Sequence, residues 1–298
     1  MYIVSNTGIT AKNTCDAQHG YMYAEELEPI VYPLHIRRGI AGHKVLETYY
    51  LARQQGLNHT SAVQEAMTTL IGIIGQADPE DIDEQHMLGH LSWLLIEYFK
   101  FYEDDQFKVI SVETAYSAKF DPPGTWRHPI DFGMILDVVL EMTTGAFRGY
   151  CNIVDHKFVN NFLSPDDLRL NTQQPKYHKV AQLNGMPIKD AIFNQIRYRK
   201  MKSPSGTDLF RRSPLLSNDT AINTVWEEAR QTAVDIYEED TGVKLANRRR
   251  RQSYSACKYC FFKDLCMAEL NGQDTTIMRK AQYQKRSRPL KDWMLSNA

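Results

Sequence analysis

The chain has 298 residues, and its 35 Lys and Arg nearly balance its 36 Asp and Glu. Apolar residues make up 43 % and charged residues 24 %, which is typical of a folded globular protein. These values exclude a largely disordered chain, a collagen-like repeat and a histone-like protein. Any contact with nucleic acid must therefore come from a local basic patch.

Two stretches bear on where the chain is located. The most apolar stretch, residues 91–102, contains Glu97 and Lys100 and is shorter than the roughly 20 apolar residues of a spanning helix. The first ten residues have neither the basic nor the apolar segment of a signal peptide. We therefore expect a cytoplasmic protein without a membrane partner, whose five cysteines are metal ligands or core thiols rather than disulfides.

The first third of the chain is predicted to be largely helical. Apolar periodicity predicts helices over 39–55, 60–75 and 84–102, the last two separated by an acidic break. His86 and His90 share one face of the third helix. Their motif, HMLGH, lacks the glutamate of HExxH and a third ligand at a recognisable spacing, so we interpret them as ordinary surface or core-edge histidines.

From residue 107 the period changes to that of strands. The pattern predicts strands over 107–116, 130–142, 146–158 and 188–198, with helices over 172–183 and 218–240. The second and third strands are predicted to form a hairpin through a tight turn, TTG at 143–145. This order of elements predicts an α/β core with helical additions.

The hairpin contains charged residues within apolar strands. Asp137 lies in its first strand, and Asp155 and Lys157 lie two residues apart in its second strand, so that these two share one face. Two carboxylates and a lysine suit phosphodiester hydrolysis, in which the carboxylates hold Mg²⁺ or Mn²⁺ and the lysine orients water or neutralises charge. The same residues also fit a buried ion pair that only stabilises the sheet.

Further residues extend this set in chain order. The motif Gly39-x-x-x-His43 lies on a helix before the hairpin, and Gln173-x-x-x-Tyr177 lies on a helix after it. The ordered set resembles the RecB-like branch of the PD-(D/E)XK nuclease superfamily. The resemblance implies a central mixed sheet flanked by helices.

The resemblance also implies a role for each residue of the set. It implies metal ligation by His43, Asp137, Asp155 and the backbone carbonyl of His156. Lys157 would be the catalytic lysine, and Gln173 and Tyr177 would support the site and touch DNA. Glu113, in the preceding strand, resembles a further acidic position of this branch.

Four cysteines form a second set. Cys257, Cys260 and Cys266 lie near the C-terminus, and Cys15 is the fourth member. Their uneven spacing accommodates either zinc or a [4Fe–4S] cluster. The layout resembles the iron–sulfur RecB-type nucleases, which include AddB and the CRISPR-associated RecB-like exonucleases, and this resemblance favours the cluster. Cys151 has no partner at ligand spacing and is interpreted as a core thiol.

These features predict one nuclease domain over 1–298, with a helical insert at 55–105, an iron–sulfur region at 245–270 closed by Cys15, and a basic tail at 271–298. The expected activity is metal-dependent exonucleolytic cleavage of DNA, with single-stranded ends as substrate, in recombination or CRISPR-adaptation-type processing. The basic run is a candidate DNA contact; it comprises Arg248, Arg249, Arg250 and Arg251.

The chain lacks a nucleotide-binding GxxxxGK[ST] motif, so it carries no helicase motor of its own and is expected to act alone, as a homo-oligomer, or beside a separate helicase or recombination partner. Three alternatives remain open. They are a catalytically silent module that binds DNA or a partner, a zinc-stapled structural protein, and a restriction-type endonuclease.

Overall fold

The computed structural model describes residues 2–120, 130–144, 148–215, 218–245, 249–251 and 253–287. The chain divides into two compact units. Unit 1 comprises Met1–Tyr32, Ser117–Met134 and Asn223–Ala298, and unit 2 comprises Pro33–Tyr116 and Ile135–Ile222. The single nuclease domain, the insert, the iron–sulfur region and the tail stay predictions, and residues 288–298 of that tail lie outside the described residues.

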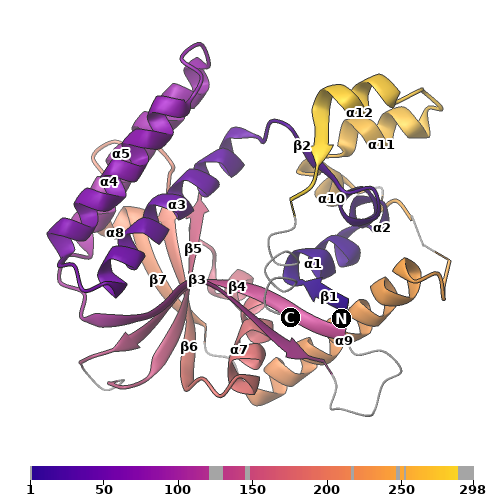
Figure 1. Ribbon diagram of the computed structural model, residues 1–298. Helices are drawn as coiled ribbons and strands as arrows, with labels where there is room; N and C mark the ends of the chain where they lie inside the picture. The colour runs from indigo at the N-terminus through magenta and orange to yellow at the C-terminus, as the bar shows by residue number, and fades with distance from the viewer. Residues whose placement is uncertain are drawn as a thin grey trace. The chain divides into compact units, whose positions relative to one another are not determined.

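A mixed sheet contains most of the strands (Figure 1). Its members are β1 (Tyr2–Ser5), β3 (Phe107–Lys119), β4 (Ile130–Met142), β5 (Cys151–Val159), β6 (Ile188–Arg197) and β7 (Phe210–Leu215). The strand order is β1-β4-β5-β6-β7, and β3 also pairs with β4. Pairing is parallel for β1–β4 and β5–β6, and antiparallel for β4–β5 and β6–β7.

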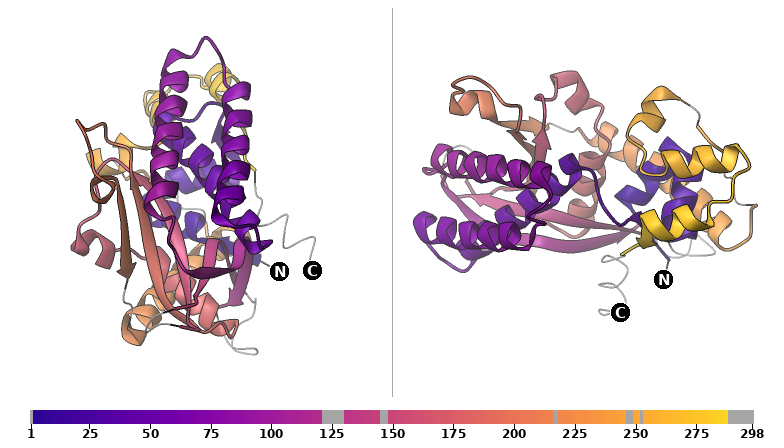
Figure 2. Two further views of the ribbon diagram at one scale, coloured as in Figure 1. Left: turned by 90° about the vertical axis from the view of Figure 1, so that its left-hand side faces the viewer. Right: turned by 90° about the horizontal axis from the view of Figure 1, so that it is seen from above.

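Helices cover both faces of the sheet in unit 2. They are α3 (Leu34–Gln54), α4 (His59–Gln76), α5 (Ile82–Phe101), α6 (Pro165–Arg169), α7 (Gln173–Leu183) and α8 (Gly206–Leu209). Helices α4 and α5 lie side by side and both contact α3 (Figure 2). Helix α3 packs on β5 and α7 packs on β6. The predicted mixed α/β fold, with helices flanking a central sheet, is confirmed.

The acidic segment between α4 and α5 supplies the N-terminal cap of α5. Asp81 accepts a hydrogen bond from the Glu84 amide at 2.9 Å, which satisfies one of the free N–H groups of the first turn. Asn58 caps α4 in the same way through the Ser61 amide. The buried faces of α3, α4 and α5 meet Val138, Val154 and Ile196 of the sheet in one apolar cluster.

Apart from one long helix, unit 1 is built mainly from short elements. Its elements are α1 (Asn6–Thr14), α2 (Asp16–His19), the π-helix η1 (Gly20–Ala24), β2 (Leu27–Pro29), the long helix α9 (Asp219–Asp240, whose first four residues belong to unit 2), α10 (Tyr254–Lys258), α11 (Lys263–Leu270), α12 (Thr276–Gln282) and β8 (Tyr283–Lys285). Strands β2 and β8 pair antiparallel. Tyr21, Phe262 and Leu265 pack in a small apolar cluster that joins the two ends of the chain.

The long elements match their predicted ranges closely, whereas the hairpin connection does not. Strand β5 begins at Cys151 rather than at residue 146. The connection is closed by hydrogen bonds that pair Met142 with Gly149 and Tyr150. Gly149 has a φ of +83°, a conformation that costs glycine little, and it therefore permits a wider loop than the predicted TTG turn. Residues 145–147 of this connection lie outside the described residues.

Hydropathy places no described helix across a membrane, because none combines enough length with enough apolar character.

Candidate active site and cysteine cavity

The candidate active site lies in unit 2, where β4 and β5 part. The ladder between these strands ends at the pair Val138–Val154. The next residues along the two strands are Asp137 and Asp155. Because side chains alternate along a strand, Asp155 and Lys157 share one face of the sheet, and His156 between them faces the other.

Helix α3 brings His43 to this point. His43 Nδ1 lies 3.3 Å from Asp137 Oδ2. The preceding residue, Gly42, lies so close to the Phe158 ring of β5 that a Cβ atom there would be 2.1 Å from its Cζ. Gly39, the glycine of the predicted motif, has nothing within 4 Å of that position. The absence of a side chain at Gly42 therefore allows α3 to lie this close to β5.

Three side chains converge on a candidate metal site. Ligand atoms of His43, Glu113 and Asp137 all lie within 4.8 Å of one another. Glu113 has a φ of +43°, which is rare for a residue with a side chain and marks local backbone strain in β3. Partial desolvation, followed by repulsion from the Asp137 and Glu47 carboxylates, raises the pKa of Glu113 to about 7. A divalent cation bound among these carboxylates would relieve their mutual repulsion. The donor set therefore fits Mg²⁺ or Mn²⁺.

Asp155 and Lys157 form a close ion pair beside this group. Lys157 Nζ lies 3.0 Å from Asp155 Oδ1 and 2.8 Å from Oδ2. Burial raises the pKa of Asp155 to about 6, although attraction to Lys157 opposes the rise. Burial lowers the pKa of Lys157, but its attraction to Asp155 outweighs this and leaves the pKa above its usual value. The lysine is therefore a cation at neutral pH, suited to neutralising charge.

Helix α7 supplies the remaining predicted pair. Gln173 Nε2 donates to Asp155 Oδ1 at 3.3 Å. Tyr177 is buried and hydrogen-bonded to Gln173, and desolvation is the largest cause of its raised pKa. The two residues thus lie in one chain of contacts that ends at Asp155, because positions four apart share a helix face.

The imidazole of His156 lies on the opposite face of the sheet. Its ring stacks on Tyr50, and its Nδ1 lies 2.7 Å from Asn194 Nδ2. The backbone amide of His156 donates to Asp137 Oδ2 at 2.9 Å, so this residue orients the carboxylate through its main chain. Metal ligation by its carbonyl, and by Asp155, stays a prediction.

The four predicted cysteine ligands line one cavity of unit 1. The cavity has a volume of about 370 Å³, and its walls include Cys15, Cys257, Cys260 and Cys266. All four are free thiols. Burial, followed by a backbone hydrogen bond that acts in the opposite sense and repulsion from the other three sulfurs, leaves the pKa of Cys260 raised. Among the described residues, no three of the sulfurs lie within 4.8 Å of one another. Cys151 lies elsewhere, buried in β5.

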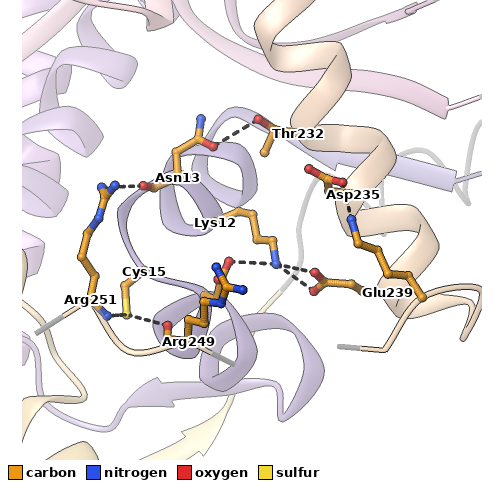
Figure 3. Close-up of polar contacts among 10 residues, drawn as sticks. Lys12, Asn13, Cys15, Thr232, Asp235, Glu239, Arg249 and Arg251 are labelled. Atoms are coloured by element: carbon orange, nitrogen blue, oxygen red, sulfur yellow. Dashed lines mark hydrogen bonds and ion pairs between the residues drawn. The ribbon is translucent and has the colours of Figure 1, made fainter. Parts of the chain in front are cut away.

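Hydrogen-bond donors surround these sulfurs. The amide of Arg251 donates to Cys15 Sγ at 3.3 Å, and the Cys15 thiol in turn donates to the Arg249 carbonyl at 3.7 Å (Figure 3). The Phe262 backbone hydrogen-bonds Cys260. The pKa of Arg250 is raised because hydrogen bonds to Cys266 and Tyr21 outweigh the opposing effect of its burial.

The predicted basic run is therefore engaged within unit 1. Arg250 pairs with Glu269 at 3.0 Å, and Arg251 Nη1 donates to the Asn13 carbonyl at 3.0 Å (Figure 3). Arg248 lies outside the described residues. A DNA contact by this run stays a prediction. Nearby, Lys12 pairs with Glu239 at 2.7 Å and joins α1 to α9.

Several supporting residues were missed at the level of sequence. Asn194 donates to Tyr98 Oη at 2.7 Å as well as approaching His156, so it couples β5 and β6 to helix α5. Gln195 is fully buried and accepts from the Leu163 amide at 2.7 Å. The sequence contained a signal for both residues, since they are polar positions inside the apolar run of the 188–198 strand. Burying such groups is costly unless they are hydrogen-bonded.

The sequence matches the family model described as the PD-(D/E)XK nuclease superfamily over residues 3–267. Among solved structures, the chain resembles a protein described as a "putative exonuclease" from Eubacterium rectale. The two share 11 % sequence identity over 86 % of each chain, with a TM-score of 0.47. None of the curated proteins matches the chain. The family match spans both units and includes all the predicted site residues, and the chain therefore belongs to the PD-(D/E)XK nuclease superfamily.

Proposed function

We propose that this nuclease is a metal-dependent exonuclease that cleaves DNA at single-stranded ends. The observation that carries the proposal is the Asp155–Lys157 ion pair beside the His43–Glu113–Asp137 group in unit 2. An ion pair that only stabilised the sheet would not require three further metal-ligand side chains at the same place. The preference for single-stranded ends rests on the resemblance to RecB-like nucleases.

The residues divide the work of phosphodiester hydrolysis. His43, Glu113 and Asp137 would hold the divalent ion, with Asp155 completing the acidic surface. When bound, Mg²⁺ or Mn²⁺ polarises the phosphate and lowers the pKa of a coordinated water. Lys157 neutralises the negative charge that develops on the phosphate oxygens. Gln173 holds the Asp155 carboxylate, and buried Tyr177 fixes Gln173 in turn.

We further propose that Cys15, Cys257, Cys260 and Cys266 bind a [4Fe–4S] cluster, with zinc as the alternative. A tetrahedral zinc with Zn–S bonds of about 2.3 Å needs its sulfurs about 3.8 Å apart. Four sulfurs that are spread around a cavity of about 370 Å³ fit a larger group better. The N–H groups directed at Cys15, Cys260 and Cys266 are of the kind that stabilise terminal thiolate ligands. The role of the bound metal centre would be to join the N-terminal and C-terminal segments of the chain.

The biological setting we propose is DNA recombination or processing, of the phage or CRISPR-adaptation type. Because the chain lacks a nucleotide-binding motor motif, it would act alone, as a homo-oligomer, or beside a separate helicase or recombination partner.

The test is cleavage of end-labelled single-stranded DNA with Mn²⁺ after anaerobic purification, comparing the wild type with Lys157→Ala. We expect the wild type to release short labelled products and the variant to lose at least 10²-fold in rate. Discrete internal cuts in plasmid DNA would instead show a restriction-type endonuclease. No cleavage by the metal-loaded wild type on single-stranded, duplex and tailed DNA would leave a catalytically silent DNA-binding module as the better description.

A further inference from the structure

Two arginines of unit 2 lie on the same face of the sheet as the catalytic ion pair. In the parallel β5–β6 ladder, Lys157 pairs with Gln195 and Val159 pairs with Arg197. In the antiparallel β6–β7 ladder, Gln195 pairs with Arg211. Paired residues of neighbouring strands point to the same side, so Arg197 and Arg211 project from the Lys157 face. The Arg211 backbone lies two strand spacings, about 10 Å, from that of Lys157.

Both guanidinium groups stack on one aromatic ring. Arg197 Cζ lies 4.6 Å and Arg211 Cζ 4.3 Å from the centroid of the Phe162 ring. The segment that carries Phe162 directly follows β5, and the Leu163 amide fixes it over the sheet by donating to Gln195 Oε1 at 2.7 Å. Gln195 is itself held by a hydrogen bond from its Nε2 to Ser213 Oγ at 3.0 Å. The ring is therefore a fixed platform for the two cations.

Acidic groups among the described residues match the two cations only weakly. The pKa of Asp208 is lowered by its hydrogen bonds with Ser205 and, to a lesser extent, by attraction to Arg197. Among the residues that the structure describes, neither Arg197 nor Arg211 forms an ion pair, whereas the adjacent Arg212 pairs with Asp105. Among the same described residues, the buried Nε of Arg197 has no hydrogen-bond acceptor. The side chain of Arg211 is exposed. Holding two like charges close together costs free energy, and a bound anion would offset that cost.

We infer that Arg197, Phe162 and Arg211 form a phosphate clamp for the substrate strand. It would hold backbone phosphates a nucleotide or two from the scissile bond, while Lys157 acts at the bond itself. Planar guanidinium groups suit this role because they present paired donors to phosphate oxygens. The clamp contacts no base edge by this reading, so it would bind without sequence preference. This inference rests on the proposed DNA substrate and assigns the path of the strand across the sheet.

The test is binding of a fluorescein-labelled single-stranded oligonucleotide to the full chain in EDTA, followed by anisotropy over a range of salt concentrations. We expect Arg197→Gln and Arg211→Gln each to raise Kd about tenfold, the loss of one charge-assisted contact. Each should also make the dependence of log K on log salt shallower by about 0.7. The double Lys variant should regain the slope of the wild type, because it restores both charges.

Cleavage kinetics with Mn²⁺ separate this role from catalysis. The double Gln variant should raise KM while kcat stays within about threefold, since the clamp holds the strand equally in the ground and transition states. Arg169→Gln is the matched control, because it removes an exposed guanidinium of the same unit that already pairs with Asp166. It should change neither Kd nor the salt slope.

The outcomes distinguish the clamp from the nuclease itself. A wild type that binds and cuts DNA, with an unchanged Kd and salt slope in the double Gln variant, would overturn the clamp and leave the proposed function intact. An equal loss in Arg169→Gln would also overturn it, since the effect would then be one of net charge. A wild type that neither binds nor cuts would overturn both.

Discussion

The two candidate centres of this nuclease are assembled in different ways. In unit 2, adjacent strands and one helix face place Asp137, Asp155 and Lys157, so that sheet register does most of the positioning. In unit 1, the cysteine cavity needs Cys15 and three further cysteines that lie more than 240 residues later. The first site therefore depends on local geometry and the second on closure of the chain. Loss of a carboxylate should therefore affect chemistry, and loss of a cysteine should affect stability.

The largest effect is expected at Asp137. We expect Asp137→Asn to lower DNA cleavage by about 10²–10³-fold, because the variant loses a charged ligand of the divalent ion. Its melting temperature should stay near that of the wild type in EDTA, since removal of one crowded carboxylate relieves repulsion. Titration calorimetry with Mn²⁺ checks the loss of metal binding directly.

Glu141→Gln is the matched control for this prediction. Glu141 lies near the C-terminal end of the same strand and pairs with Lys108 at 3.6 Å. It should cleave DNA and bind Mn²⁺ like the wild type. If Asp137→Asn kept full activity and Mn²⁺ affinity, the assignment of the metal site would be wrong.

The next effect should appear at the cysteines and should leave unit 2 intact. We expect Cys257→Ser to lose bound iron and to become more sensitive to proteolysis in unit 1, because a structural metal centre contributes folding free energy. Cys151→Ser keeps the cavity and should retain its iron. Metal analysis and limited proteolysis after anaerobic purification measure both. Stoichiometric zinc in a colourless wild-type protein would decide against the cluster.

A smaller effect is expected where helix and strand meet. Gly42→Ala forces a methyl group into the Phe158 ring, and such overpacking costs about 1–3 kcal/mol. It should also weaken Mn²⁺ binding, because α3 would carry His43 away from Asp137. Gly39→Ala meets no atom and should be neutral or slightly stabilising, since alanine favours a helix. Thermal melts with and without Mn²⁺ compare the two variants. Equal melting temperatures for Gly42→Ala and Gly39→Ala would contradict the role assigned to Gly42.

The smallest effect is one of pH. The pKa of Glu113 is raised to about 7 and that of Asp155 to about 6, so the metal-free folded protein binds protons that the unfolded chain releases at lower pH. Its stability should therefore fall as the pH rises from about 4 to 7 through these groups. Mn²⁺ must displace the protons, and its affinity should drop about tenfold from pH 8 to pH 6. Titration calorimetry with Mn²⁺ at pH 8 and pH 6 tests this prediction. In Glu113→Gln, the Mn²⁺ affinity should depend less on pH.

Regular elements with strong periodicity could be predicted from the sequence, and short elements could not. The alternation around Asp155 and Lys157 identified their common face without any structure. Strands β2 and β8 have three residues each, too few for a period to be read, and their pairing joins distant parts of the chain.

The candidate site was predictable where spacing along one element determines it. His43, Asp137 and Asp155 followed from motif order, but the role of Gly42 depends on how closely α3 approaches β5. The stack of Arg197, Phe162 and Arg211 depends on register across three strands and on the path of a loop, neither of which a single sequence contains.

The pairing of β2 with β8 has a consequence for synthesis on the ribosome. Leu27 is made before its partner Lys285, which lies 258 residues later in the chain. At about 5–20 residues per second, the N-terminal segment waits roughly 10–50 s for its partner. For most of that interval Cys15 lacks the other three cysteines of the cavity. The proposed metal centre can therefore be completed only after Cys266 has been made.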